Sequence, residues 1–279
     1  MRELVFSFIS STSSPLFASY LCFSRYNPYM RRRFFVDRFE SDSAALRGET
    51  AEHLGRVLRA EPGQLYELSD GHRVWLGRVE DVALPKRGES RIEFALVEPI
   101  PAREPALRIE LLISVVKFDR FEWCLEKATE LGVSEIVPLA AARTDKPLLA
   151  AAGKRHARWE KIILESAQQS RRLRPPLIRA VASPEEVFAH SSSACKIFLS
   201  ERPDAPRLHE LLRSPSIPPA GTAGTAALAI GPEGGWTDAE IAAAGAGGFA
   251  EASLGETILR TETAVLASIA VIRFALGDF

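Results

Sequence analysis

An apolar run, a glycine-rich turn and a helix start follow one another directly in the stretch Ala226-Ala227-Leu228-Ala229-Ile230-Gly231-Pro232-Glu233-Gly234-Gly235-Trp236-Thr237-Asp238-Ala239-Glu240. Its first five residues are wholly apolar, which is typical of a strand covered on both faces in a parallel sheet. Thr237 and Glu240 have the spacing of a capping box, and Gly247-Gly248 ends the helix that they open. Glycines in such a turn let the backbone approach a ligand, although a plain tight turn is the commoner meaning of this spacing. The stretch matches neither G-x-G-x-x-G nor a P-loop, so a pyrophosphate site is not expected.

Strand and helix patterns alternate on both sides of this stretch, from residue 107 to the C-terminus. Further strands are predicted at Arg108–Val116, Ile136–Leu139, Ile197–Leu199 and Ala252–Leu254. Helices are predicted at Asp119–Leu131 with an Asp N-cap, Lys154–Ser170, from Ser183-Pro184 onward, Leu208–Arg213 and Thr261–Leu276. Repeated strand–helix units predict an α/β fold with a mostly parallel sheet and ligands at the carboxyl ends of its strands.

Residues 30–98 have a different pattern, of short strands with turn signals between them. Strands are predicted at Phe34–Val36, Leu65–Leu68, Val74–Val79 and Ile92–Val97, with one helix at Glu49–Arg59. This pattern predicts a small β-barrel. Proline-rich residues 99–106 are predicted to be a stiff linker to a second domain over residues 107–279.

The first 29 residues differ from the rest, with three charged residues in a serine-rich, apolar background. The apolar runs Leu4–Ile9 and Leu16–Phe23 are too short to span a bilayer, and no clear signal-peptide pattern is present. We expect residues 1–29 to be a doubtful leader and Met30 to be the biological start.

Composition and charge describe a soluble, intracellular, globular chain, which we expect to be cytoplasmic and free of any membrane partner. Hydrophobic residues make up 46% of the chain, charged residues 25%, and the net charge is −1. The charge is unevenly spread, because residues 154–179 hold eight Lys and Arg against two Glu, whereas residues 181–279 hold six against twelve acidic residues. A solvated helix face explains the basic run, and a polyanion-binding stripe is the alternative. Three distant cysteines and scattered histidines indicate no disulfide framework and no metal site.

Three other segments have candidate chemistry, each with a plain structural alternative. In Leu254–Ala264, Ile258 and Leu259 come just before a helix start. They could bind a flat heteroaromatic ring, and the alternative is that they are buried in the hydrophobic core. Ala167–Pro175 ends the basic helix with arginines that fit phosphate or uracil carbonyl oxygens. Lys117–Val133 begins a charged helix, for which salt bridges along the helix are the alternative.

Taken together, these motifs resemble the RsmE-type 16S ribosomal RNA (uracil-N3)-methyltransferases of the SPOUT class. The resemblance covers residue 30 to the end and rests on segments in one order: Lys117…Arg120…Glu122…Lys127–Val133, Arg158-Trp159…Arg172, Ile230–Gly235…Glu240 and Leu254…Ala264. It implies a SPOUT-type parallel sheet with a C-terminal trefoil knot, preceded by a PUA-like RNA-binding barrel. It also implies a homodimer through the knot, S-adenosyl-L-methionine as cofactor, and 16S ribosomal RNA or the small ribosomal subunit as partner. The expected activity is methylation of N3 of one uridine, at position 1498 in conventional ribosomal RNA numbering.

The resemblance also assigns candidate site residues. The cofactor-binding residues it implies are Leu199, Ser200, Glu201, Ile230, Gly231, Pro232, Glu233, Gly234, Gly235, Leu254, Gly255, Ile258, Leu259 and Arg260. Arg172 is the expected catalytic residue, with Arg171 beside it as the alternative, because a cation could stabilise negative charge on the uracil ring. Glu201, Glu233 and Glu262 are candidate bases for the N3 proton. RNA contacts are expected from Arg31, Arg32, Arg33, Arg59, Lys117, Arg158, Arg171 and Arg174. No metal is expected, since methyl transfer from a sulfonium depends on positioning.

Two other functions stay open at this point. One is a SPOUT methyltransferase that acts on another ribosomal RNA or transfer RNA position. The other is a non-catalytic RNA-binding protein of ribosome assembly, in which the cofactor loops are vestigial.

Overall fold

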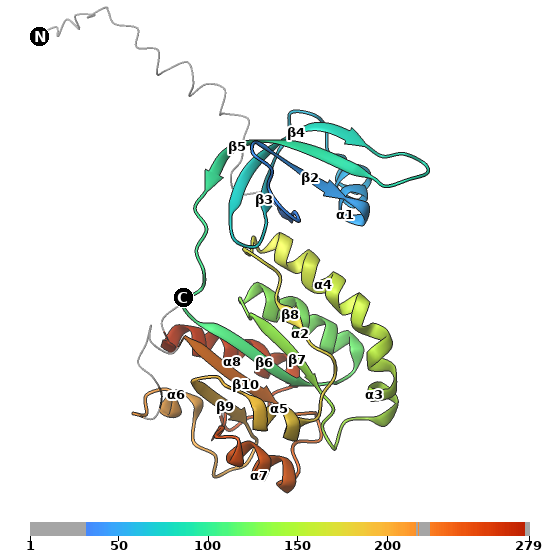
Figure 1. Ribbon diagram of the computed structural model, residues 1–279. Helices are drawn as coiled ribbons and strands as arrows, with labels where there is room; N and C mark the ends of the chain where they lie inside the picture. Colours follow the sequence, from blue (N-terminus) through green and yellow to red (C-terminus); the bar gives the residue numbers. More distant parts are fainter. Residues whose placement is uncertain (1–31, 216, 218–223, 277–279) are drawn as a thin grey trace, which may run out of the picture. The chain divides into compact units, whose positions relative to one another are not determined.

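The computed structural model describes residues 32–215, 217 and 224–276 (Figure 1). The predicted leader, residues 1–29, and the predicted RNA contact Arg31 lie outside these ranges. Within the described ranges, no helix is long and apolar enough to cross a membrane.

The N-terminal part of the described chain forms a five-stranded sheet in the order β1-β3-β4-β5-β2. Its strands are β1 (Arg33–Phe35), β2 (Ser43–Arg47), β3 (Leu65–Ser69), β4 (Val74–Ala83) and β5 (Arg91–Ile100). Strand β1 pairs with β3 in parallel, and the other pairs are antiparallel. The predicted helix is present as α1 (Gly48–Glu52) followed by a π-helical turn. The core of this N-terminal part is filled by apolar side chains that include Phe34, Leu46, Leu54, Leu68 and Phe94.

Two details of this part differ from the sequence-based prediction. Strand β2 was not predicted, because it is short and has polar residues at both ends. Strand β5 continues to Ile100 by pairing with Val74 of β4, so Pro99 and Ile100 of the predicted linker belong to the strand. The chain then leads by a single extended segment into β6 (Arg108–Ser114).

The C-terminal part contains a six-stranded sheet, and its strands are parallel as predicted. Their order is β11-β9-β10-β6-β7-β8. Besides β6, these are β7 (Glu135–Leu139), β8 (Leu177–Ile178), β9 (Cys195–Leu199), β10 (Thr225–Ile230) and β11 (Ala250–Ala252). The apolar run of the opening stretch is β10, which pairs with β9 on one side and β6 on the other.

Helices follow the strands and cover both faces of this sheet. They are α2 (Phe118–Glu130), α3 (Lys146–Ala152), α4 (His156–Gln169), α5 (Pro184–His190), α6 (Leu208–Leu211), α7 (Asp238–Ala246) and α8 (Thr261–Leu276). Asp119 does not cap α2 as predicted, because the helix begins one residue earlier and Lys117 is the N-cap. The predicted basic helix is present as α4, with α3 and a short 3-10 turn leading into it.

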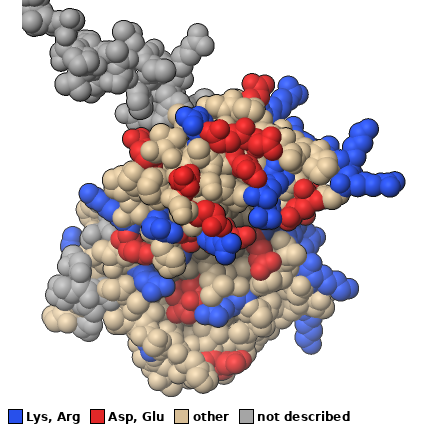
Figure 2. Space-filling view, turned by 45° about the horizontal axis from the view of Figure 1, so that its top comes forward, with Lys and Arg blue, Asp and Glu red and all other residues tan. Residues whose placement is uncertain are grey.

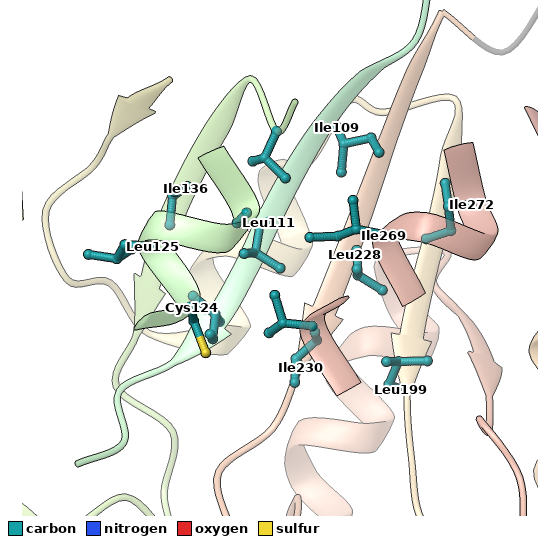
Figure 3. Close-up of a cluster of buried hydrophobic side chains, with 14 of the residues drawn as sticks. Ile109, Leu111, Cys124, Leu125, Ile136, Leu199, Leu228, Ile230, Ile269 and Ile272 are labelled. Atoms are coloured by element: carbon teal, nitrogen blue, oxygen red, sulfur yellow. The ribbon is translucent and has the colours of Figure 1, made fainter. Parts of the chain in front are cut away.

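Strand β10 shows why the sheet is covered on both faces. Leu228 and Ile230 face a cluster that includes Cys124 and Leu125 of α2 and Ile269 and Ile272 of α8 (Figure 3). Ala227 and Ala229 face the opposite cluster, where Phe188, Phe198, Trp236 and Phe249 pack. A strand buried on both faces needs apolar residues at every position, and this explains the unbroken apolar run.

Candidate cofactor cavity

Three loops at the carboxyl ends of β9, β10 and β11 surround one cavity of about 630 Å³. All the residues predicted to bind the cofactor line it: Leu199, Ser200, Glu201, Ile230, Gly231, Pro232, Glu233, Gly234, Gly235, Leu254, Gly255, Ile258, Leu259 and Arg260. They come from segments separated by 18 or more residues of chain, so only the parallel sheet brings them together. The structure therefore brings these distant motifs together in one site.

The glycines of the loop after β10 are required by close packing. A Cβ atom on Gly231 would lie 2.8 Å from the ring of Trp236, and Gly235 has a φ of +71°. Trp236 in turn donates a hydrogen bond from Nε1 to the Leu199 carbonyl oxygen, at 2.9 Å. One tryptophan thus ties the loop after β10 to the loop after β9, and only glycine fits beneath its ring.

The capping box predicted at Thr237 and Glu240 is present and extends beyond its own helix. Glu240 Oε2 accepts hydrogen bonds from the backbone N–H and the hydroxyl of Thr237, at 2.8 and 2.7 Å. Its Oε1 accepts from the backbone N–H of Ala142, at 2.8 Å. Nearby, Arg143 Nη1 donates to the Gly234 carbonyl oxygen at 3.0 Å. The segment after β7 is therefore attached to the glycine-rich loop by a fully buried carboxylate and an arginine.

One wall of the cavity contains an arginine that sequence reasoning did not place there. Arg120, from the first turns of α2, forms an ion pair with Glu233 of the glycine-rich loop. Its Nε also lies 3.9 Å from Glu262 Oε1, in the first turn of α8. Arg120 belongs to the Lys117–Val133 motif, and it reaches the cavity because α2 directly follows β6, the strand next to β10.

Glu262 lies in a shielded position behind this arginine. Its Oε2 is buried and accepts no hydrogen bond from the part of the chain that the structure describes. Burial, together with the charge of Glu262, raises the pKa of the adjacent Cys124 thiol to about 12. The Glu262 side chain therefore lies beneath the cavity wall, in the first turn of α8.

The expected catalytic residue, Arg172, lies in a different cavity. This second cavity, of about 530 Å³, shares no lining residue with the first. Arg172 Nη1 donates to the carbonyl oxygens of Thr129 and Val133, at 2.9 and 2.5 Å, where α2 ends. Burial and the charge of Arg273 lower the pKa of Arg172 to about 10, which leaves it charged at neutral pH. Its catalytic role stays a prediction, and its visible role is to bind the end of α2.

The residues predicted to contact RNA fall into two groups. Several are held by carboxylates: Arg33 by Glu67, Arg158 by Glu122 and Arg174 by Glu104, while Arg171 lies 3.9 Å from Glu67. Arg32, Arg59 and Lys117 are exposed. In Figure 2, basic side chains project along the right edge of the molecule, and acidic and basic side chains are mixed elsewhere on that face. Among the described residues, no cluster of three or more His, Cys, Asp or Glu could hold a metal ion.

Comparison with known proteins agrees with this geometry. Residues 103–273 match a family model described as an RNA methyltransferase domain. The chain is 33% identical to the ribosomal RNA small subunit methyltransferase E of a Synechocystis species over 235 residues, which cover 80% of this chain and 70% of the relative. It is 28% identical to the Bacillus subtilis protein of the same name, covering 87% of this chain and 96% of the relative.

A solved structure of the same kind superposes over nearly its whole length. It is the ribosomal RNA small subunit methyltransferase E of Neisseria gonorrhoeae bound to S-adenosyl methionine, with a TM-score of 0.76 and 31% identity. The alignment covers 89% of this chain and 99% of that structure. The cavity, the motifs that line it and these matches together show that the chain belongs to the ribosomal RNA small subunit methyltransferase E family.

Proposed function

We propose that this protein transfers a methyl group from S-adenosyl-L-methionine to N3 of one uridine in 16S ribosomal RNA, the uridine at position 1498 in conventional numbering. The observation that supports this most directly is the single cavity formed by the three motif-bearing loops. Family membership supports methyl transfer to ribosomal RNA as the reaction. Because ribosomal RNA is the substrate, we propose that the protein acts in the cytoplasm.

The residues of the cavity fit this cofactor. Gly231 and Gly234 let the loop backbone pack closely against Trp236 and Arg143, and Ile258 and Leu259 supply an apolar wall for the adenine ring. Glu201, Glu233 and Glu256 bring negative charge to the site of a cationic sulfonium. The bound cofactor supplies an electrophilic methyl group, and the loops of this chain orient it toward the base.

RNA binding is assigned to the barrel and to the basic surface around α4. We assign residues 30–98 to a PUA-like RNA-binding barrel, 99–106 to a linker and 107–279 to the methyltransferase domain. The exposed cations Arg32, Arg59 and Lys117 support this assignment, as does the arginine-lined second cavity. Arginine forks in such a cavity match phosphate oxygens.

A trefoil knot at the C-terminus is also part of the proposal. Strands β10 and β11 flank β9 on opposite sides, yet α8, which follows β11, packs against β10 and α2. Residues 253–260 must therefore cross back past the ends of β9 and β10. This crossing supports the threading that the family resemblance implies.

We further propose that two copies pair through this knotted region. Phe274 of α8 and Ile258 of the cofactor loop are 82% and 80% exposed. Large apolar side chains so exposed are a feature of protein–protein interfaces. A homodimer through α8 would cover both.

The experiment that tests this function is complementation. A bacterial strain that lacks its own small-subunit uridine-N3 methyltransferase is given this chain, and N3-methyluridine in its 16S ribosomal RNA is mapped by mass spectrometry. Restoration of one mark, at the expected uridine, is the result that the proposal requires. A mark at another ribosomal or transfer RNA position would change the substrate, and bound RNA without any mark would indicate a non-catalytic assembly protein.

A further inference from the structure

We propose that Arg120 is a catalytic residue of this reaction: its guanidinium holds a carbonyl oxygen of the target uracil and stabilises the ring's negative charge as the N3 proton passes to Glu233. The inference rests on the proposed function. It assigns the cation that the reaction requires to the cofactor cavity instead of to the cavity of Arg172.

The reaction requires a cation beside the uracil. N3 of uridine holds a proton and becomes a nucleophile only when that proton leaves, which places negative charge on the ring and its two carbonyl oxygens. The N3–methyl bond then forms as the carbon–sulfur bond breaks, and the proton passes through a carboxylate to solvent. A fixed positive group at the site of the new charge lowers the barrier to this step.

Arg120 is the arginine in the cofactor cavity whose contacts fit this task. Arg143, by contrast, donates to the Gly234 carbonyl oxygen. Arg202 donates to Asp204 at 3.1 Å and lies 3.8 Å from Glu251, and Arg260 is exposed. The side chain of Arg120 is 28% exposed and lies beside two carboxylates, that of Glu233 in the cavity lining and that of Glu262 behind it.

The two carboxylates around Arg120 differ in a way that suggests their roles. The side chain of Glu262 is 18% exposed and belongs to a long helix, so it anchors the guanidinium from behind. The side chain of Glu233 is 47% exposed and belongs to the glycine-rich loop. A uracil oxygen that takes the place of Glu233 on Arg120 leaves that carboxylate unpaired, next to the N3 proton. Entry of the substrate therefore frees Glu233, the proposed proton acceptor, from its ion pair with Arg120.

The test compares Arg120→Ala, Arg120→Lys and Glu233→Gln with Arg143→Ala, another arginine of the same cavity. The other charged side chains that line it are Glu201, Arg202, Glu256 and Arg260, and they are unchanged in every variant. Each purified full-length variant is checked for thermal unfolding and for S-adenosylmethionine affinity by calorimetry. Methylation rates are then measured on small subunits that lack the mark, between about pH 6.5 and 9.5.

Arg120→Ala is expected to bind S-adenosylmethionine within about threefold of the wild-type affinity and to lose about 100-fold in rate at pH 7. Its rate is expected to rise about tenfold per pH unit, because hydroxide then drives the ionisation that the arginine assisted. Arg120→Lys keeps the positive charge but lacks the paired N–H donors of a guanidinium, and its methylation rate is expected to fall about tenfold. Glu233→Gln is expected to share the pH dependence of Arg120→Ala, whereas Arg143→Ala weakens cofactor binding and keeps the wild-type pH profile.

Subunits that contain 5-fluorouridine, whose N3 proton is more acidic, provide a second readout. With these subunits, the loss of methylation rate in Arg120→Ala is expected to be at least tenfold smaller, and the loss in Arg143→Ala is expected to be unchanged. A methylation rate of Arg120→Ala near that of the wild type overturns the inference. The inference is also overturned if the rate falls only as much as the S-adenosylmethionine affinity falls and neither pH nor 5-fluorouridine changes the difference from the wild type. A wild-type chain that methylates no uridine N3 overturns the proposed function itself.

Discussion

A glycine of the loop after β10 gives the first residue-scale prediction. A Cβ atom on Gly234 would lie 3.3 Å from Arg143 Cβ, so the branched side chain of Gly234→Val must displace the arginine that binds this loop. We expect S-adenosylmethionine affinity to fall at least tenfold, which is about 1.4 kcal/mol of binding free energy, measured by calorimetry. Gly245→Ala on α7, where a Cβ meets nothing within 4 Å, is the control. Equal affinities for the two variants would contradict the loop assignment.

The two described cysteines give a second prediction at this scale. Burial raises the pKa of Cys195 to about 11, and burial with the charge of Glu262 raises that of Cys124 to about 12. Both thiols should therefore resist a thiol reagent at pH 8 in the folded protein and react after unfolding. Because the unfolded thiols ionise first, folding stability should also fall as the pH rises from about 9 toward 12. Fast labelling of Cys124 in the folded protein would show that this core opens.

The residues predicted for the cofactor loops line one cavity, whereas the contacts of the arginines were not predicted. The loops are continuous motifs, so each residue's place follows from its neighbours in sequence. The contacts of an arginine depend on which element packs opposite it. Arg172 meets the carbonyl oxygens at the end of α2, and Arg120 meets carboxylates from two distant segments. Sequence spacing contains no information on these contacts.

At the scale of elements, the attachment of α7 to the segment after β7 is open to test. Glu240 is fully buried and accepts three hydrogen bonds, so Glu240→Ala leaves buried donors without a partner. We expect the free energy of unfolding to fall by about 2–4 kcal/mol, measured with urea, and cofactor affinity to fall with it. Asp238→Ala, an exposed position in the same turn, should change stability by less than about 0.5 kcal/mol. A small effect of Glu240→Ala would mean that the cap does not hold the loop.

Elements with their own local signals were predicted, and those that depend on pairing were missed. Strand β10 and the cap of α7 are visible in the sequence because burial on both faces and capping chemistry each demand particular residues. Strands β2 and β8 are short, and each is a strand because its neighbour supplies the hydrogen bonds. Helix α2 begins without a side-chain cap, which explains why its first residue was misplaced.

At the scale of the whole molecule, the exposed apolar face of α8 predicts an assembly. Phe274→Glu places a charge at the proposed dimer interface and should convert the protein to a monomer in light-scattering measurements. Val57→Glu makes a comparable change at another exposed apolar position, 64% accessible, and should leave the oligomeric state unchanged. A wild-type monomer at micromolar concentration would contradict the pairing.

Net charge proved a poor guide to the partner at this scale. A value of −1 conceals a basic central region and an acidic C-terminal one. Many of the arginines are also already paired, as Arg33 and Arg158 show. RNA affinity therefore depends on which cations are exposed or line a cavity, and the sequence does not distinguish these from the paired ones.

The order of the cavity's walls along the chain has a consequence for biosynthesis. The loops after β9 and β10 leave the ribosome first, and the last wall, around Ile258 and Thr261, is made only as α8 begins. A nascent chain released before that point has no complete cavity and lacks Ile269 and Ile272, which cover one face of the sheet. Prematurely terminated chains would thus combine lost cofactor binding with exposed apolar surface, a state that cellular proteases remove.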